Sequence, residues 1–249
     1  MLRQPLLDKL SALRLTGFCQ ALMEQREMAH YGELAFEDRL GLLVDREWTR
    51  RENNRHQRLL KAARFHQPAC IEDLDLSPAR GLDRRLVLEL ADSQWVRHHL
   101  NAIVLGPTGA GKTYLACALG QAACRQRLTV RYVRTSRLLD ELSHAQADGS
   151  YPSLLHTLAR IDLLVLDDWM RDPLTAKQTR DLLEVLDDRY GQRSTLLAGQ
   201  VPVAEWHSRF PDPTLADAIL DRLVHNAYRL ALKGESQRKS RSPLAMVNT

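Results

Sequence analysis

A glycine-rich stretch at residues 106–113 has the residue types and the spacing needed to bind a nucleoside triphosphate. It reads Gly-Pro-Thr-Gly-Ala-Gly-Lys-Thr and matches the pattern Gly-x-x-x-x-Gly-Lys-Thr. Its glycines let successive backbone N–H groups turn inward around phosphate oxygens. Lys112 supplies a full charge to the β- and γ-phosphates, and the Thr113 hydroxyl can ligate magnesium. The residues expected to contact the nucleotide are Gly106, Pro107, Thr108, Gly109, Ala110, Gly111, Lys112, Thr113 and Tyr114.

The elements that flank this loop are those that a phosphate-binding loop requires. Ile103, Val104 and Leu105 form a short apolar run, which is typical of a buried parallel strand. Residues 114–120 are good helix formers, so a helix should follow and point its positive N-terminal end at the phosphates. A strand before the motif and a helix after it argue against a chance glycine loop. The chain is therefore predicted to bind ATP or GTP.

Two acids, Asp167 and Asp168, follow a second apolar run at residues 163–166. Open parallel sheets place their ligands at the C-terminal ends of strands. Asp167 is suited to orient magnesium through its water shell, and Asp168 is suited to polarise an attacking water. Two acids after an apolar run also occur as a plain strand end, but a phosphate loop upstream favours the catalytic interpretation.

Polar residues later in the chain could complete the site. Gln200 follows an expected strand and could reach between the phosphate and the attacking water, or it could be a turn residue. A long helix is expected over residues 216–232, which would place Arg222 and Arg229 on one side because they are seven residues apart. Arg238 could fold back to the phosphates, or it could belong to a frayed basic tail.

A run of basic residues marks the second half of the N-terminal region. Acids such as Glu47 and Glu52 offset only part of its charge, and spacings of three and four place many of the cations on one helical surface. A solvated helix face is the alternative, but the excess of one sign favours a surface that faces phosphates. The residues concerned are Arg46, Arg50, Arg51, Arg55, Arg58, Lys61 and Arg64.

Length and composition set the class of the protein. The chain has 249 residues, of which 44% are hydrophobic and 27% charged, and its net charge is +4. One substantial α/β domain and a smaller appendage fit that length. The charge permits a phosphate-rich partner without requiring one. Since no apolar stretch approaches membrane-spanning length, we expect no membrane association and a cytoplasmic protein.

Helical periodicity without strand signals indicates an all-helical N-terminal domain at residues 1–66. Breaks at Gln67-Pro68 and Ser77-Pro78 predict a linker over residues 67–80. From residue 81 to 249, strands alternate with helices, which predicts an α/β domain with a parallel, doubly wound sheet.

Several motifs together resemble the IstB-like ATP-binding proteins, helper ATPases that bacterial insertion sequences encode beside a transposase. These are AAA+ proteins related to DnaC-type helicase loaders and DnaA-type initiators. The C-terminal motifs are far more specific than the phosphate loop, and the resemblance spans nearly the whole chain. Besides the loop, the matching stretches are residues 36–48, 148–151, 166–169, 212–223 and 233–239.

The resemblance implies ATP as the nucleotide, with Mg²⁺, and ATP-dependent assembly of identical subunits around duplex DNA with little sequence preference. It also implies stimulation of a partner transposase at its target site. A replicative helicase loader from the same superfamily is the alternative, and the partner of the N-terminal region would distinguish the two. A small-molecule kinase would need an acceptor pocket, and no residue pattern marks one.

The resemblance also assigns roles to single residues. Arg222 matches the arginine that a neighbouring subunit supplies to each active site, with Arg229 as the reserve candidate. Gln200 matches the first-sensor position and Arg238 the second-sensor position. Asp168 stands where AAA+ proteins usually carry a glutamate, and the residues after Tyr228 are too few for a full AAA+ lid, which implies a reduced C-terminal lid.

Overall fold

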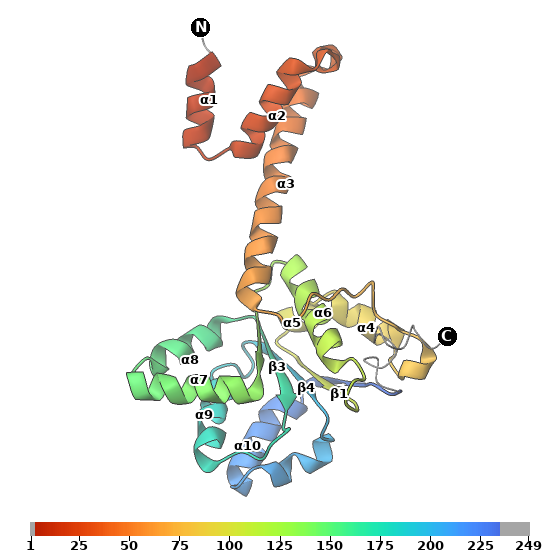
Figure 1. The fold of residues 1–249 in the computed structure, drawn as a ribbon, viewed down its shortest axis with the longest axis vertical. Helices are drawn as coiled ribbons and strands as arrows, with labels where there is room; N and C mark the ends of the chain where they lie inside the picture. Colours follow the sequence, from red (N-terminus) through yellow and green to blue (C-terminus); the bar gives the residue numbers. More distant parts are fainter. Residues whose placement is uncertain (1–2, 235–249) are drawn as a thin grey trace, which may run out of the picture. The chain divides into compact units, whose positions relative to one another are not determined.

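The computed structural model describes residues 3–234 and is drawn as a ribbon in Figure 1. Its contacts divide the chain into Met1–Arg58, the N-terminal unit, and Leu59–Thr249, the sheet unit. Residues 67–80, which we predicted as a linker, are grouped with the sheet unit, and Ala69 and Ile71 among them are buried in its core. The predicted domain limits stay a prediction. None of the helices in the described part of the chain is long and apolar enough to cross a membrane.

Helices make up the N-terminal unit, as the sequence predicted. They are α1 (Arg3–Ala12), α2 (Thr16–Glu27), the 3-10 turn η1 (Ala29–Glu33) and the greater part of α3 (Phe36–Ala63). Leu10, Ala21 and Leu43 are buried between them.

A buried carboxylate fastens α2 to α3. Glu47 of α3 accepts hydrogen bonds from the backbone N–H groups of Gly17 (2.7 Å) and Phe18 (3.2 Å). These N–H groups belong to the first turn of α2, whose positive end favours a negative charge. Gly17 is required there, because a Cβ would lie 3.0 Å from the Glu47 carboxylate and 3.2 Å from the carbonyl oxygen of Arg46. One acid therefore ties the N-terminal end of α2 to α3.

The sheet unit alternates strands and helices. Its strands are β1 (Asn101–Leu105), β2 (Val130–Arg134), β3 (Leu163–Trp169), β4 (Ser194–Gly199) and β5 (Ala227–Ala231). Its helices are α4 (Arg84–Ala91), α5 (Gln94–Arg97), α6 (Lys112–Arg125), α7 (Thr135–Asp148), α8 (Tyr151–Arg160), α9 (Ala176–Asp187) and α10 (Pro213–Val224). The 3-10 turns η2 (Pro78–Arg80), η3 (Val203–Glu205) and η4 (His207–Arg209) lie in the connections.

All five strands run parallel, in the order β2-β3-β4-β1-β5. β1 lies between β4 and β5, and β3 lies between β2 and β4. The C-terminal ends of β1 and β3 therefore meet at one edge of the sheet, where the phosphate loop and the two acids follow them. The fold places the phosphate loop and the two acids at the same end of the sheet.

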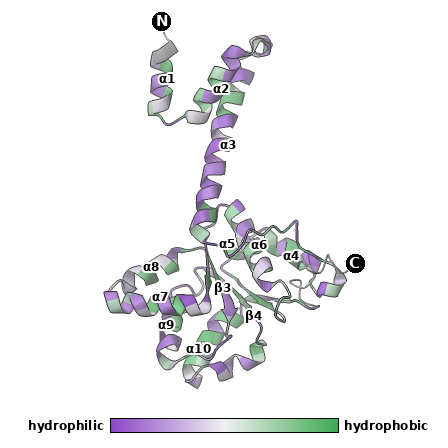
Figure 2. Cartoon of the chain, viewed as in Figure 1, coloured by the Kyte–Doolittle hydropathy of each residue, from purple (hydrophilic) through white to green (hydrophobic). Residues whose placement is uncertain are grey.

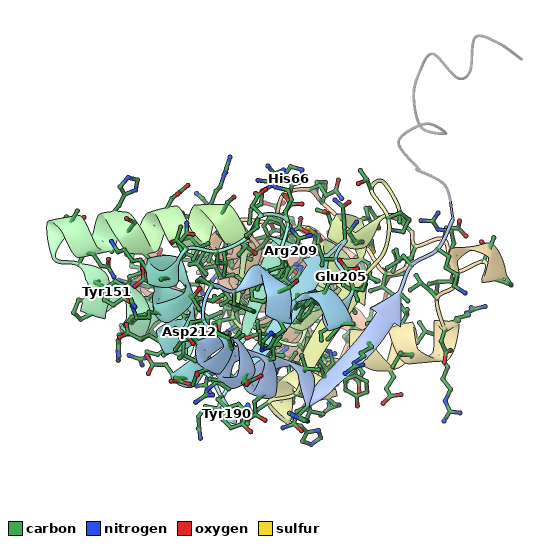
Figure 3. All side chains as sticks on the ribbon, turned by 90° about the horizontal axis from the view of Figure 1, so that it is seen from below. His66, Tyr151, Tyr190, Glu205, Arg209 and Asp212 are labelled. Carbon is green, nitrogen blue, oxygen red and sulfur yellow. The ribbon has the colours of Figure 1, made fainter. Side chains whose placement is uncertain are left out.

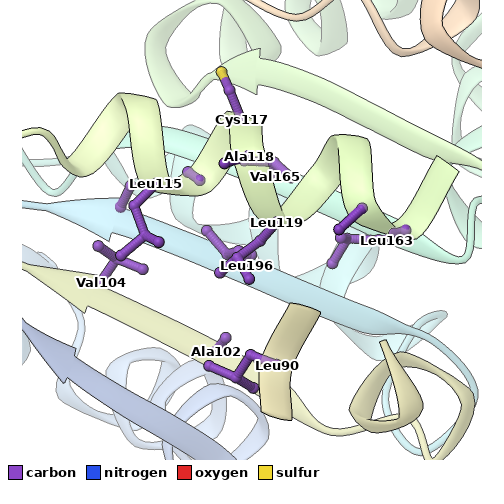
Figure 4. Close-up of a cluster of buried hydrophobic side chains, with 14 of the residues drawn as sticks. Leu90, Ala102, Val104, Leu115, Cys117, Ala118, Leu119, Leu163, Val165 and Leu196 are labelled. Atoms are coloured by element: carbon purple, nitrogen blue, oxygen red, sulfur yellow. The ribbon is translucent and has the colours of Figure 1, made fainter. Parts of the chain in front are cut away.

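Each face of the sheet carries its own cluster of buried side chains. On β1, Ala102 and Val104 belong to the cluster beneath α6, whereas Ile103 belongs to the cluster beneath α9 and α10. This is the alternation expected of a strand buried on both faces. Figure 4 shows Leu115 and Leu119 of α6 within the first cluster. Helices cover both faces, so the prediction of a doubly wound α/β sheet is confirmed.

The prediction of one helix over residues 216–232 is wrong. α10 ends at Val224, and Ala227–Ala231 form β5 at the edge of the sheet. The open edge of β1 offers backbone partners along its whole length, from Asn101 beside Ala227 to Leu105 beside Ala231. That pairing outweighs local helix propensity, which is a weak preference. Arg222 and Arg229 consequently do not share a helix face.

Candidate active site

The phosphate loop joins β1 to α6 in the conformation that its glycines allow. Gly109 has a φ of 80° and Gly111 a φ of 96°, both in the left-handed region that side chains disfavour. At Gly106 the reason is close approach, since a Cβ would lie 2.7 Å from the carbonyl oxygen of Leu232. α6 begins at Lys112, so its first N–H groups face the loop. This is the geometry of an anion site at a helix N-terminus.

Side chains hold the loop closed around the place where phosphates would bind. The Lys112 ammonium is buried and donates to the carbonyl oxygen of Pro107 at 2.9 Å. Arg80, also buried, donates to the carbonyl oxygen of Ala110 and lies 3.9 Å from the carboxylate of Asp75. Sequence reasoning missed Arg80, which precedes the loop by a whole helix and strand. A triphosphate can replace the carbonyl as the partner of Lys112.

Asp167 is buried at the end of β3 and is surrounded by hydroxyl donors. Its Oδ2 accepts from the Thr113 hydroxyl at 2.8 Å and from the Tyr132 hydroxyl at 2.6 Å. The Thr135 hydroxyl donates to its backbone carbonyl at 3.0 Å. The hydroxyl and carboxylate oxygens of Thr113 and Asp167 are hard ligands that fit Mg²⁺, which takes few protein ligands and keeps several waters. The two predicted metal residues thus lie together.

Asp168 has a different environment. Its backbone is in the left-handed region (φ 53°), where the register of β3 against β4 shifts after Leu166. This bend directs its carboxylate away from the strand, and about a third of the side chain is exposed. Arg134 (3.6 Å) and Arg171 (3.8 Å) form ion pairs with its Oδ2. Sequence reasoning did not find these two guanidinium groups.

Gln200 lies beside the phosphate loop. Its Oε1 accepts a hydrogen bond from the Thr108 hydroxyl at 2.7 Å. The preceding residue, Gly199, pairs in register with Leu105 of β1, the residue before the loop. This pairing of β4 with β1 brings the amide of Gln200 to the loop.

The sequence of the whole chain matches a known family. Residues 8–245 fit the family model of the IstB-like ATP binding protein. The chain belongs to the IstB-like ATP-binding proteins. It is therefore an ATPase that binds ATP, and the family resemblance predicted from its motifs is confirmed.

Relatives with assigned names point to insertion sequences. An insertion sequence ATP-binding protein of Sinorhizobium fredii is 45% identical over 240 residues, which cover 96% of this chain and 98% of the relative. The ATP-binding protein of insertion sequence IS1162 from Pseudomonas fluorescens is 47% identical over 203 residues, covering 81% of this chain and 88% of the relative.

Solved structures show the same fold at low identity. The DnaC helicase loader superposes with a TM-score of 0.54 at 19% identity, over 66% of this chain and 97% of that one. DnaA from Aquifex aeolicus, bound to the ATP analogue AMPPCP, superposes with a TM-score of 0.56 at 14% identity, over 73% and 57% of the two chains. The AAA+ fold predicted for this IstB-like protein is confirmed by these likenesses.

Arg222 of this IstB-like protein lies away from its own phosphate loop. Its backbone carbonyl accepts from the side chain of Asn101 at 3.0 Å, at the N-terminal end of β1, whereas the loop leaves the C-terminal end. Its guanidinium pairs with Asp187 and lies 5.8 Å from the ring centre of Tyr190. Figure 3 shows Tyr190 and His66 on opposite sides of the sheet unit. Arg222 therefore has its contacts at a distance from Asp167 and Lys112.

The other candidate arginines are placed differently. Arg229 is exposed on β5, paired in register with Ile103. Arg238 lies outside the described residues, as does the rest of the predicted lid. Tyr114 lies in the first turn of α6, and its hydroxyl accepts a hydrogen bond from the backbone N–H of Cys70 at 3.2 Å.

The basic run forms part of α3, which is mostly hydrophilic in Figure 2. Arg46 pairs with Glu24 at 2.8 Å. Arg50 and Arg51 both pair with the buried Glu47, at 2.6 Å each. These cations thus have a role in holding the helices together, in addition to any contact with a partner. Further along α3 and just beyond it, Arg55, Arg58, Lys61 and Arg64 are exposed.

Proposed function

We propose that this protein is an ATP-dependent helper of transposition that assembles on duplex DNA and stimulates a partner transposase at its target site. The observation that carries the proposal is the hydrogen bond between Thr113 and Asp167 beside the phosphate loop, in a chain that is 45% identical to an insertion sequence ATP-binding protein. We place its action in the cytoplasm, where a bacterial transposase meets DNA.

ATP hydrolysis follows from the groups at the edge of the sheet. Lys112 exchanges the Pro107 carbonyl for the β- and γ-phosphates, while the backbone N–H groups of the loop enclose them. Thr113 and Asp167 would hold Mg²⁺, which would neutralise charge that develops on the phosphates. Asp168 accepts a proton from the attacking water, and Gln200 orients that water against the γ-phosphate.

Duplex DNA is bound through its phosphates. Four cations of the run are exposed and do not pair with the buried Glu47, so they can contact the phosphates of DNA. They are Arg55, Arg58, Lys61 and Arg64. Arg46, Arg50 and Arg51 add positive potential to the same run. Contacts of this kind read the backbone and not the bases, so binding should show little sequence preference.

A neighbouring subunit supplies Arg222 to the γ-phosphate. The residue sits at the end of β1 opposite to the loop, as an arginine that acts on another subunit must. Its pair with Asp187 is partly exposed, and such pairs contribute only about 0–1 kcal/mol, so Arg222 can leave it for a phosphate. Arg229 remains the reserve candidate for the arginine that a neighbouring subunit supplies. Arg238 remains the candidate for the second-sensor position.

A helicase loader is the alternative function. The likeness to DnaC concerns the fold, at 19% identity, whereas the insertion-sequence relative from Sinorhizobium fredii is 45% identical over 96% of this chain. The second observation favours transposition.

The proposal is tested by measuring transposition into target DNA with the transposase proposed as the partner. Wild-type protein with ATP should raise the number of insertions, and Lys112→Ala should not, because it leaves the triphosphate charge uncompensated. Arg84→Ala, an exposed change on α4, is the matched control and should behave as wild type. Stimulation of a replicative helicase, with no effect on the transposase, would instead establish the loader.

A further inference from the structure

A tyrosine that no motif contains touches the metal-binding carboxylate. Tyr132 lies on β2, two positions before Arg134, which is in register with Asp167 on β3. Its hydroxyl donates to Asp167 Oδ2 at 2.6 Å, the same oxygen that accepts from Thr113. Tyr132 is buried, so the carboxylate of Asp167 and not solvent is the partner of its hydroxyl.

The two donors restrict how Asp167 can turn. Thr113 approaches from the start of α6 and Tyr132 from β2, so two separate elements grip one oxygen. Among the described residues, Asp167 Oδ1 accepts no hydrogen bond, which leaves it for a water molecule of the cation. The Thr113 hydroxyl would be shared between the cation and this carboxylate, whereas the Tyr132 hydroxyl would bond the carboxylate alone.

The ring of Tyr132 is itself held by the segment that follows α3. His66 stacks on it, with ring centres 6.4 Å apart and planes inclined by 18°. That segment is fixed along α6, because Gly120 leaves room for the ring of Phe65, at 2.5 Å from where a Cβ would be. Further along, Cys70 bonds the Tyr114 hydroxyl. The segment, α6 and Tyr132 thus form one packed layer behind the metal site.

We propose that Tyr132 is a positioning residue of the magnesium site, which orients Asp167 for the cation and is in turn held by His66. It rests on the role proposed above for Asp167. Groups that hydrogen-bond a metal ligand from behind typically contribute a factor of 10–100 to metal affinity. The strength of Mg²⁺ binding is then set partly by residues outside both nucleotide motifs.

The test is a Mg²⁺ titration of the full chain bound to a fluorescent ATP analogue, in the absence of DNA and transposase. Tyr132→Phe removes one oxygen and keeps the ring, and it should weaken Mg²⁺ binding roughly tenfold. Binding of the analogue in EDTA should be unchanged, since the loop and Lys112 are untouched. Hydrolysis should recover at high Mg²⁺, with a raised KM for the metal and a kcat near that of wild type.

The matched control is Tyr151→Phe. The Tyr151 phenol also donates to a carboxylate, that of Glu184, but it lies on α8 outside the nucleotide site. Its loss should leave the Mg²⁺ titration unchanged. His66→Ala keeps the phenol and removes the stacked ring, so it should weaken Mg²⁺ binding in the same direction by roughly twofold to fivefold. It also tests the proposal if Tyr132→Phe does not fold.

An unchanged Mg²⁺ titration in both Tyr132→Phe and His66→Ala would overturn the proposal. So would weaker analogue binding in EDTA together with an unchanged Mg²⁺ dependence, since that is what a purely structural residue would give. The result is independent of transposition: a protein that fails to help a transposase can still show the Mg²⁺ shift, and the reverse also holds.

Discussion

Among single residues, the two neighbouring acids at the end of β3 differ in what surrounds them. Asp167 is buried and receives hydroxyl donors, which suits a carboxylate that stays in place. Asp168 is partly exposed and faces the guanidinium groups of Arg134 and Arg171 at 3.6 and 3.8 Å. Pairs this long and exposed are weak, so a water and a γ-phosphate can replace them.

We predict that Asp168→Asn keeps ATP binding and lowers hydrolysis by roughly two orders of magnitude or more, because it removes the base that accepts the proton of water. Single-turnover hydrolysis, measured beside equilibrium binding, separates the two effects. Asp172→Asn is the control, since Asp172 also pairs with Arg171 but lies beyond β3. Hydrolysis at the wild-type rate in Asp168→Asn would assign the base to another residue.

How far sequence could predict this site depends on how local each feature is. The phosphate loop was predictable because its glycines, lysine and threonine are close together in the sequence. Tyr132, Arg134 and Arg80 were not, since they reach the site only through strand pairing and loop packing between distant segments. The role of Glu47 in joining α2 to α3 could not be predicted for the same reason. In the sequence, an acid within a basic run only indicates partial neutralisation of the positive charge, and its contact with α2 is known only from the structure.

Between elements, the joint of α2 and α3 depends on the charge of Glu47. Hydrogen bonds from Arg50 first, then from Arg51 and the α2 backbone, lower its pKa from 4.5 to about 2 despite burial. A lowered pKa means that the folded form prefers the ionised acid. Its contribution to stability is therefore present above pH 4.5 and is lost as the pH falls towards 2.

We predict that Glu47→Gln loosens α2 at neutral pH, by about 1–3 kcal/mol, because backbone donors lose a charged acceptor. Hydrogen exchange of the α2 amides measures this opening directly. The difference from wild type should shrink as the pH approaches 2, where Glu47 itself becomes neutral. Glu52→Gln, which changes an acid paired with Arg55 at 3.8 Å, serves as the control. Equal exchange in the Glu47 variant and wild type would contradict the role given to this acid.

The basic face of α3 gives a prediction about DNA. Reversing Arg55 and Arg58 to Glu should weaken duplex binding and reduce its dependence on salt, because fewer counterions are released. These two residues are chosen because Arg50 and Arg51 also hold Glu47, so that changing them would disturb the fold. Reversing Arg84 and Arg85 on α4 makes the same change in net charge elsewhere and is the control. Equal losses of DNA affinity in the two double variants would mean that only the net charge of the protein matters.

The strand β5 is the element that the sequence did not predict. Its residues carry a helical pattern from α10 onward, and only the free edge of β1 makes them a strand. The elements around the phosphate loop were predicted correctly because their signals are strong and local. An edge strand depends on a partner more than a hundred positions earlier in the chain.

For the whole molecule, the prediction concerns subunits acting on one another. Arg222→Ala should bind ATP normally and lose hydrolysis and ATP-dependent assembly. An arginine supplied by a neighbouring subunit raises the rate of phosphoryl transfer roughly a thousandfold or more. Mixing it with Lys112→Ala combines one intact pocket with one intact arginine, so part of the hydrolysis should return. Arg229→Ala is the comparison variant and should assemble as wild type. Mixed assemblies without hydrolysis would place Arg222 within its own subunit.

The position of β1 in the sheet has a consequence for how the protein is made. Both neighbours of β1, β4 and β5, are synthesised after it, and β5 is the last of the described strands to leave the ribosome. Contacts this distant in sequence form slowly, whereas the local helices of the N-terminal unit can form at once. A nascent chain that has emerged as far as α8 contains the complete nucleotide motif, yet β1 has no strand beside it. Nascent chains should therefore acquire ATP binding only after β5 has left the ribosome.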